Sequence, residues 1–360
     1  MRICIVGNLR YWQNNFYKDK TVLVTGHTGF KGSWLSVMLQ MAGAKVVGYA
    51  LPAEGEENLF SLAHVAEGMC SVEGDIRDLA HLKQVFEEHR PEIVFHLAAQ
   101  PIVRESYHNP VYTYETNVMG TVNLMECVRT TGGVRSVLNV TTDKVYENRE
   151  WCWGYRETDA LDGYDPYSNS KSCSELVTHS YKKSFFDELG IPVSTARAGN
   201  VIGGGDFAAD RIIPDCVRAA MEHREIILRN PYSVRPFQHV LEPLSAYLMI
   251  AEKQAADPKK QGYYNVGPEE ADCVTVGELA TLFCDAWQEG VSWKNVSDEG
   301  PHEAAFLKLD CSKIKRTLGW KSRWNIRTAV EKTVEWSRIY RDQSDVRACM
   351  EAQIREFMEL

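Results

Sequence analysis

The sequence lacks the features that mark membrane, secreted and metal-binding proteins. It has no apolar run long enough to span a bilayer, and its first residues lack the order of a signal peptide. Its ten cysteines are scattered singly, without a Cys-x-x-Cys pair or a metal-ligand spacing with histidine. We therefore expect a cytoplasmic chain with reduced thiols and no bound metal. The net charge of −9 argues against nucleic acid or an anionic membrane as the main partner.

What the sequence does contain is a glycine-rich turn between a strand and a helix. The apolar run at 21–25 predicts the strand, and a helical pattern of apolar residues follows from Trp34. Glycines in such a turn let the backbone approach a pyrophosphate, and the helix N-terminus favours its charge. A tight turn without a ligand is the alternative. The candidate cofactor residues here are Gly26, His27, Thr28, Gly29, Phe30, Lys31 and Gly32.

Strands and helices alternate along the chain as far as Arg197. This alternation predicts an α/β fold with a doubly wound parallel sheet of the Rossmann type, whose ligands bind beyond the carboxyl ends of the strands. Small residues after the strand at 93–97 then let a flat cofactor lie close to the backbone. We predict further strands at 45–49, 70–73, 136–140 and 193–196, and helices at 79–89, 110–131 and 168–189.

After Arg197 the pattern changes to recurring glycine, proline, arginine and aromatic residues. We predict a dinucleotide-binding Rossmann domain from residues 1–197 with 235–268, and a smaller C-terminal substrate domain from 198–234 with 269–360. The first domain includes 263–266, which reads as a late strand that returns to the sheet.

Two further features of a dinucleotide fold are missing. Residues 2–7 could form a strand, but only one glycine follows it, so we interpret this stretch as peripheral. In NAD-binding folds an acidic residue at the end of the second strand usually holds the adenosine ribose. Here that strand is followed by Ala50, Leu51 and Pro52. These residues therefore do not choose between NAD and NADP.

The stretch Tyr167-Ser-Asn-Ser-Lys171 carries the central chemical signal. Positions four apart share one face of a helix, so both side chains can reach one bound molecule. A lysine ammonium beside a phenol lowers the pKa of the phenol, which can then take a proton from an alcohol. Apolar residues from Cys173 to Phe185 recur at helical spacing on a different face. The alternative is an exposed tyrosine and lysine at the start of a helix.

Three polar residues, Thr142, Asp143 and Lys144, follow the strand at 136–140. Thr142 can hydrogen-bond a substrate hydroxyl beside Tyr167, and the two charges indicate proton transfers besides hydride transfer. The alternatives are a threonine that satisfies the backbone and an exposed turn that carries two charges. Together with the phosphate turn, these residues predict a nicotinamide enzyme that acts on a hydroxyl group.

Seven stretches of the chain resemble the extended short-chain dehydrogenase/reductases, and within them the nucleotide-sugar 4,6-dehydratases. The resemblance runs from about Phe16 to about Trp320. The glycine turn and Tyr-x-x-x-Lys are typical of the whole superfamily, whereas Thr-Asp-Lys and Arg-Pro-Phe-Gln-His resemble the branch that acts on CDP-glucose. In dTDP- and GDP-sugar relatives the triplet reads Thr-Asp-Glu or a similar form, so Lys144 is the sharpest departure. The stretches are residues 26–34, 96–100, 141–146, 167–171, 197–206, 210–215 and 234–240.

The resemblance implies NAD as the cofactor and a reaction in three steps. Tyr167 takes the proton of the C4 hydroxyl while NAD accepts the hydride, Thr142 orients that hydroxyl, and Lys171 holds the nicotinamide ribose. Water is then eliminated across C5 and C6, with Asp143 as the acid and Lys144 as the base or as a stabiliser of the enolate. The hydride finally returns to C6. The further cofactor residues implied are Asp75, Ile76, Leu97, Ala98, Ala99, Gln100 and Asn117.

The resemblance also implies the partners. CDP-glucose is the implied substrate, and arginine suits its diphosphate because the guanidinium fork pairs with phosphate oxygens. We expect a homodimer or tetramer, because 110–131 and 168–189 are apolar on more than one side and the matching helices of relatives form a four-helix interface. The alternatives are another nucleotide-sugar dehydratase, a 4-epimerase and a non-catalytic NAD(H)-sensing protein. The implied substrate-binding residues are Arg104, Asn200, Arg211, Arg235 and His239.

Overall fold

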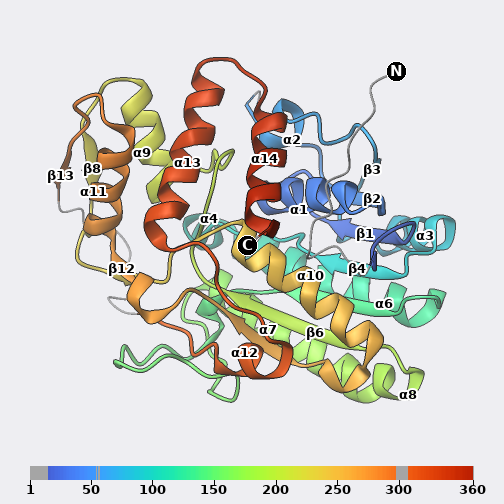
Figure 1. Cartoon of the computed structure of the whole chain (residues 1–360). Coiled ribbons are helices and arrows are strands. Elements are labelled where there is room, and N and C mark those ends of the chain that lie inside the picture. Colours follow the sequence, from blue (N-terminus) through green and yellow to red (C-terminus); the bar gives the residue numbers. More distant parts are fainter. Residues whose placement is uncertain (1–14, 54, 56, 297–306, 360) are drawn as a thin grey trace, which may run out of the picture.

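The computed structural model describes residues 15–53, 55, 57–296 and 307–359 (Figure 1). The possible strand at 2–7 therefore lies outside the described residues. At the centre of the molecule is a seven-stranded sheet in the order β11-β6-β5-β4-β1-β2-β3. None of the described helices is both long and apolar enough to cross a membrane. The strands of the sheet are β1 (Thr21–Thr25), β2 (Lys45–Ala50), β3 (Cys70–Glu73), β4 (Ile93–His96), β5 (Ser136–Val140), β6 (Val193–Ala198) and β11 (Tyr263–Val266).

All neighbouring strands of this sheet pair in parallel. Every residue of β4, β5 and β6 is buried, because these strands are nearly continuous runs of small and apolar residues that suit a sheet covered on both faces. The strand order reverses between β1 and β4, and such a switch point is where doubly wound folds bind ligands. The predicted fold class is confirmed, and each predicted strand lies within two residues of an observed one.

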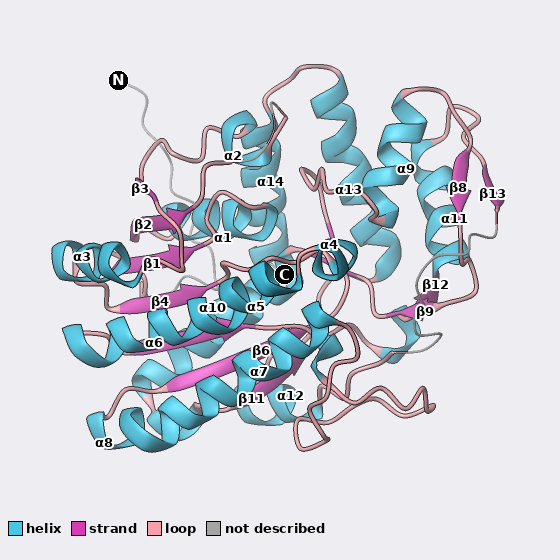
Figure 2. Ribbon diagram, turned by 180° about the vertical axis from the view of Figure 1, so that it is seen from behind, coloured by secondary structure: helices cyan, strands magenta, loops and turns pink. Residues whose placement is uncertain are grey.

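Helices cover both faces of the sheet, as Figure 1 and Figure 2 show. One face packs against α1 and α10, with α14 lying on α1, and the other packs against α3 and α6, with α7 beside α6. Short helices lead into and out of these layers. The bounds are α1 (Phe30–Met41), α2 (Leu59–Leu62), α3 (Leu79–His89), α4 (Val103–His108), α5 (Pro110–Tyr114), α6 (Gly120–Thr131), α7 (Pro166–Tyr181), α8 (Asp187–Leu189), α10 (Leu241–Ala256), α12 (Ser312–Leu318) and α14 (Val346–Glu359).

A second apolar core lies to one side of the sheet, at the left of Figure 1, and is built from α9, β8, α11 and α13. α14 belongs to the predicted substrate domain but packs into the same core as α1. The division of the chain at 197, 235 and 268 stays a prediction. The remaining elements are β7 (Val201–Ile202), α9 (Ile212–Met221), β8 (Ile226–Leu228), β9 (Val234–Arg235), β10 (Gln238–His239), β12 (Val274–Thr275), α11 (Val276–Trp287), β13 (Trp293–Asn295) and α13 (Ile326–Arg341).

Two helices that the sequence predicts as continuous each contain a π-helical segment. η2 (Glu115–Met119) joins α5 to α6, and η4 (Lys182–Phe186) joins α7 to α8. Such segments insert a residue into the helical repeat and are frequent at functional sites. η2 carries Asn117, one of the predicted cofactor residues.

Candidate active site

The glycine turn folds back on itself between β1 and α1. Gly26 has a φ of 75°, a left-handed conformation that favours glycine. A Cβ atom there would lie 2.8 Å from the Ala98 nitrogen, and one at Gly32 would lie 2.1 Å from the Gly26 oxygen. Both positions therefore exclude a side chain, and the turn lies directly against the segment that follows β4. The result is a close-packed backbone cradle at the N-terminus of α1, which suits a phosphate group.

The side chain of His27 packs between this turn and β2. Its ring is fully buried against Gly48 of β2, and its Nε2 lies 2.7 Å from the Ser71 hydroxyl oxygen. Burial lowers the pKa of His27 to about 4, so the ring is neutral near pH 7. Thr28 donates its hydroxyl to the Leu51 oxygen at 3.0 Å and ties the turn to the segment where the usual acidic residue is missing. The His27 side chain thus packs beneath the turn rather than at its ligand face.

The segment after β4 is joined to η2 and α7. The Asn117 side chain accepts a hydrogen bond from the Gln100 amide at 2.8 Å and donates to the Gln100 oxygen at 3.1 Å. It also donates to the Ser170 hydroxyl of α7 at 2.9 Å. Asn117 therefore links the two segments that carry predicted cofactor residues, which follow β4 and begin α7.

α7 begins at a strong cap and turns a polar face toward the sheet. The Asp165 side chain accepts a hydrogen bond from the Ser168 amide, and Pro166 occupies the first turn. Lys171 is only 4% exposed, and its Nζ donates to the Val140 oxygen at 3.2 Å. The alternative of an exposed lysine at a helix start is therefore wrong. The exposed face is instead the apolar one, with Leu176 56% exposed.

The triplet Thr142-Asp143-Lys144 turns sharply at the end of β5. Thr142 caps the 3-10 helix η3 (Asp143–Val145), and its hydroxyl donates to Asp143 Oδ1 at 3.0 Å. Asp143 is 2% exposed, and its Oδ2 has no hydrogen-bond partner among the described residues. Burial raises the pKa of Asp143, although the charges of Lys144 and Arg235 oppose that shift. Asp143 therefore holds its proton more tightly than an ordinary aspartate.

Tyr167 lies next to this triplet. Burial raises the pKa of Tyr167 to about 12, the side chain of Thr142 opposes that shift, and the charge of Asp143 adds to it. The structure thus brings Tyr167, Thr142 and Asp143 together, as the sequence predicts. The sequence predicts a Tyr167 pKa lowered by Lys171, whereas burial raises it here and outweighs the opposing effects of Thr142 and Arg211.

Cations from three elements surround Asp143 and Tyr167. Burial, together with the charge of Arg211, lowers the pKa of Lys31 to about 8. Burial, together with the charge of Lys31, lowers the pKa of Lys171 to about 8. Lys31, one of the predicted cofactor residues, thus lies close enough to Asp143 for their charges to interact. Clustered cations of this kind suit a polyanionic ligand.

Two of the predicted substrate residues, Arg211 and Arg235, lie close enough to Tyr167 and Asp143 for their charges to act on them. Arg211 pairs with Asp206 at 2.8 Å, and Arg104 pairs with Asp210 at 3.4 Å. Arg235 is close enough to Asp143 for its charge to lower that pKa. Asn200 lies one residue before β7, and its backbone oxygen accepts a hydrogen bond from the Gln238 amide at 3.0 Å. The roles of these residues stay predictions.

His239 does not belong to this group. It is 0% exposed, and its ring packs edge-on against Trp34 and Trp324, with centroid distances of 6.0 and 4.9 Å. Its Nδ1 accepts a hydrogen bond from the Leu241 amide at 3.3 Å. His239 is therefore enclosed on two sides by indole rings, and its contact with the substrate stays a prediction.

Asp75 and Ile76 follow β3 at the edge of the predicted cofactor region. Asp75 pairs with Arg77 at 2.7 Å, which lowers the pKa of its carboxyl. Ile76 is buried against Gly120, where a Cβ atom would lie 2.7 Å from an Ile76 methyl group.

Within the described ranges there is no group of three or more His, Cys, Asp or Glu residues that could hold a metal ion.

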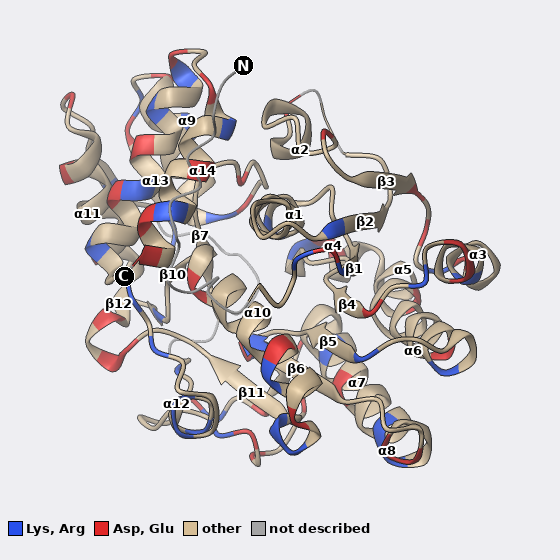
Figure 3. Cartoon of the chain, turned by 45° about the vertical axis from the view of Figure 1, so that its right-hand side comes forward, with Lys and Arg blue, Asp and Glu red and all other residues tan. Residues whose placement is uncertain are grey.

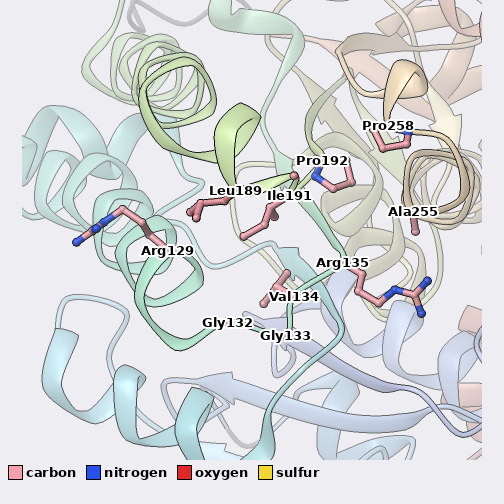
Figure 4. Close-up of a pocket in the computed structure, with 11 residues that line it drawn as sticks. Arg129, Gly132, Gly133, Val134, Arg135, Leu189, Ile191, Pro192, Ala255 and Pro258 are labelled. Carbon is pink, nitrogen blue, oxygen red and sulfur yellow. The ribbon is translucent and has the colours of Figure 1, made fainter.

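The structure also contains a concave pocket near the amino-terminal ends of β5 and β6 (Figure 4). Its volume is about 310 Å³, and its lining includes Gly132–Arg135, which precede β5, and Ile191 and Pro192, which precede β6. Arg129 at its rim already pairs with Glu126. This pocket lies where strands begin, whereas the residues described above lie where strands end. It is therefore separate from the candidate active site.

Comparison with known proteins places the chain in a family. Residues 23–333 match the family model described as GDP-mannose 4,6 dehydratase. The chain belongs to this dehydratase family. It is 47% identical over 351 residues to the CDP-glucose 4,6-dehydratase of Salmonella typhimurium, which covers 96% of this chain and 98% of that protein. It is 28% identical to the dTDP-glucose 4,6-dehydratase of Shigella flexneri, over 88% of this chain and 92% of that protein.

The fold of this dehydratase matches solved structures of related enzymes. One is the UDP-glucose 4-epimerase of Thermus thermophilus in complex with NAD, with a TM-score of 0.78 and 25% identity. The match covers 88% of this chain and 99% of that one.

The sequence interpretation missed two residues beside the candidate active site, Glu175 of α7 and Arg197 of β6, which form a buried ion pair. The available signal was a charged residue inside an otherwise uncharged strand, Val-Ser-Thr-Ala-Arg-Ala.

Proposed function

We propose that this dehydratase converts CDP-glucose to CDP-4-keto-6-deoxyglucose with NAD as its cofactor. The observation that carries the proposal is the cluster in which Tyr167 of α7 meets the buried residues Thr142 and Asp143 at the end of β5. In this cluster Tyr167 can act on the substrate hydroxyl during oxidation, and the neighbouring acid, Asp143, can serve the elimination of water. The choice of CDP-glucose among nucleotide sugars is supported by the 47% identity to the Salmonella enzyme.

The backbone cradle supports NAD as the cofactor. The glycine turn is too closely packed for side chains at Gly26 and Gly32, which is the geometry that lets a backbone approach a pyrophosphate. The related epimerase of known structure is described as a complex with NAD. The turn residues, Gln100, Asn117 and Lys171 would hold the cofactor in this chain. When bound, NAD supplies the acceptor for the C4 hydride and the donor that returns it to C6.

Tyr167 and Thr142 serve the first step. Thr142 orients the C4 hydroxyl, and Tyr167 takes its proton as C4 becomes a ketone. Because burial raises the pKa of Tyr167 to about 12, the free phenol is almost fully protonated near pH 7. Proton removal from Tyr167 therefore has to be aided by Lys171 and the other cations once substrate is in place.

Asp143 and Lys144 serve the second step. The 4-ketone acidifies the C5 proton, and the C6 hydroxyl needs a proton to leave as water. Burial raises the pKa of Asp143, so this carboxyl is suited to donate that proton. Lys144, its neighbour, then takes the C5 proton or stabilises the enolate oxygen. The cations Lys31, Arg211 and Arg235 suit the diphosphate of the substrate.

A substrate panel tests the proposal. Purified protein is incubated with CDP-, dTDP-, GDP- and UDP-glucose, and the 4-keto-6-deoxy product is measured. We expect turnover of CDP-glucose. Turnover of another nucleotide sugar alone would contradict the choice of substrate, and a product that keeps its C6 hydroxyl would identify an epimerase. Nucleotide binding without turnover of any sugar would favour the NAD(H)-sensing alternative.

We also propose that the protein forms a homodimer through α5, η2 and α7. Apolar side chains lie exposed on neighbouring helices, with Val111 69%, Met119 51% and Leu176 56% exposed. A second copy that covers this face would remove them from water. A tetramer is the alternative assembly. The cytoplasmic location stays a prediction that rests on the cysteines, since all nine described ones are unpaired.

A further inference from the structure

The central sheet contains one buried charge. Its seven strands, all of them described, carry Lys45, Glu73 and Arg197, and only Arg197 is buried, at 2% exposed. Figure 3 shows that the other charges gather on the helices and loops. Arg197 pairs with Glu175 of α7, which is 1% exposed. Arg197 Nε donates to Oε1 at 3.0 Å, and Nη2 donates to Oε2 at 2.9 Å.

Both carboxylate oxygens of Glu175 accept further hydrogen bonds. The Thr141 hydroxyl donates to Oε1 at 2.5 Å, and the Thr195 hydroxyl donates to Oε2 at 2.8 Å. Burial acts to lower the pKa of Arg197, but the Glu175 carboxylate outweighs that effect and raises it. A buried ion pair is costly to desolvate and often stabilises a fold no more than apolar residues of similar volume. Its complete hydrogen bonding therefore points to a role in fixing geometry.

The ion pair holds both ends of the segment that carries the triplet. Thr141, which donates to Glu175, directly precedes Thr142. Beyond the triplet, Arg197 Nη1 donates to the Tyr146 hydroxyl at 2.9 Å, and that hydroxyl donates to Asn265 of β11 at 2.6 Å. Residues 142–144 thus lie between two anchors, one bonded to Glu175 and the other to Arg197, which the ion pair joins.

The same pair holds the helix that carries the other catalytic residues. Tyr167, Lys171 and Glu175 are spaced four residues apart and share one face of α7. Lys171 Nζ donates to the Val140 oxygen, one residue before Thr141. α7 is therefore tied to the end of β5 at two successive turns. Figure 2 shows α7 lying alongside β6, the strand of Arg197.

We propose that the Glu175–Arg197 ion pair is a positioning device that fixes Tyr167 on α7 relative to the acid and base residues at 142–144. Both are positioning residues, because they act through Thr141, Tyr146 and α7. The proposal rests on the proposed function for its kinetic consequences. Its electrostatic consequence concerns Lys171. Burial and the charge of Lys31 lower the pKa of Lys171, whereas the charge of Glu175 raises it.

The experiment compares Glu175→Gln and Arg197→Lys with a matched control. Gln254→Met removes a buried amide of α10 that accepts from the Ser194 hydroxyl and donates to the Ser136 hydroxyl at 2.8 Å. Ser136 begins β5 and Ser194 is the second residue of β6, so the control loosens the same two strands at their other ends. Each variant is measured for kcat and KM with CDP-glucose, for its pH profile and for its thermal midpoint. Tyr146→Phe is a milder substitute if Glu175→Gln does not fold.

The expected results separate geometry from charge. Glu175→Gln should lower kcat by about 10- to 100-fold with little change in KM, because misplacement of catalytic groups by about 1 Å costs that much. The alkaline limb of its pH profile should also move to lower pH than in the wild type, since Lys171 loses its proton earlier without the charge of Glu175. Arg197→Lys keeps the cation, so it should lower kcat without that shift. Gln254→Met should lower the thermal midpoint and leave kcat unchanged.

Two results would overturn the proposal. The first is a wild-type kcat and pH profile in Glu175→Gln and Arg197→Lys together with a lower thermal midpoint, because the pair would then only stabilise the fold. The second is a crystal structure of Glu175→Gln in which the positions of Tyr167 and Asp143 are unchanged. The crystal structure decides the proposal even if the wild-type protein turns over no nucleotide sugar, a failure that would concern the proposed function alone.

Discussion

Replacement of Asp143 by asparagine should stop the reaction halfway and at the same time stabilise the protein. Asparagine has the shape of aspartate but cannot give a proton to a leaving hydroxyl group. Asp143 is 2% exposed, and its Oδ2 has no hydrogen-bond partner among the described residues. The ionised form is therefore poorly solvated, and burial raises the pKa of its carboxyl.

The kinetic magnitude follows from the role as an acid that we propose for Asp143. A positioned general acid is worth about 10²- to 10⁴-fold in rate, or about 3–5 kcal/mol of transition-state stabilisation. Oxidation at C4 does not need this proton. The Asp143→Asn variant should therefore form the 4-ketone and reduce its bound cofactor but release the 6-deoxy product at least about 100-fold more slowly.

The effect on stability has the opposite sign and depends on pH. The pKa of Asp143 is higher in the folded than in the unfolded chain, so the folded state holds the proton more tightly. Its contribution to stability is present below the unfolded pKa of about 3.9 and is lost as the pH rises through the folded pKa. Near pH 8 the wild type bears the cost of a poorly satisfied buried carboxylate, about 1–3 kcal/mol. The asparagine variant avoids that cost, so its advantage should shrink toward pH 4.

The assay combines three measurements on one preparation. The absorbance of the reduced nicotinamide follows C4 oxidation after CDP-glucose is added, product analysis follows elimination, and chemical denaturation near pH 8 and pH 4 gives the stability. Asp78→Asn is the matched control, because Asp78 caps α3, which carries none of the cluster residues, and asparagine caps a helix equally well. A near wild-type product rate, or lower stability than the wild type near pH 8, would refute this account of Asp143.

Three further outcomes are expected. Lys144→Met should still oxidise C4 but lose exchange of the C5 hydrogen with deuterated solvent, and normal exchange would show that Lys144 is only a charged turn residue. Gly32→Ala should weaken NAD binding by tenfold or more in calorimetry and destabilise the fold by about 1–3 kcal/mol, since its Cβ would lie 2.1 Å from the Gly26 oxygen; an unchanged affinity would mean that the turn does not contact the cofactor. Leu176→Glu should shift sedimentation at micromolar concentration toward the monomer, because it places a charge on a 56% exposed apolar side chain of α7; an undisturbed dimer would place the interface elsewhere.

The sheet could be predicted from the sequence because its strands are short apolar runs separated by helical patterns. β1, β3, β5 and β11 have the predicted bounds, although β3 is largely exposed and only the other three are buried runs. The π segments could not be predicted in this way. η2 and η4 interrupt helices whose side-chain pattern is continuous, and their geometry depends on contacts such as that between Asn117 and Gln100.

The residues of the candidate site that belong to a sequence motif could be predicted. Those that only packing brings to the site could not. Thr142, Asp143 and Tyr167 do meet, because parallel strands and the helices between them bring their ends to one edge. The burial that raises the pKa of Tyr167 could not be predicted, since the depth of burial is a property of the whole fold. The enclosure of His239 by the rings of Trp34 and Trp324 could not be predicted for the same reason.

α7 shows why its functional face could not be read from hydrophobic periodicity. The apolar residues that predict the helix include Leu176, which the structure leaves exposed, whereas the buried face carries Ser174, Glu175 and Thr178. A buried polar face is tolerated only when each group finds a partner, and here Ser174 and Thr178 both bond the Asn139 side chain. Such a face holds the helix at one register, because sliding would break several bonds at once. A helix that must hold Tyr167 and Lys171 in place is therefore best fixed by polar contacts, and its apolar face is the one that we propose a second copy of the chain covers.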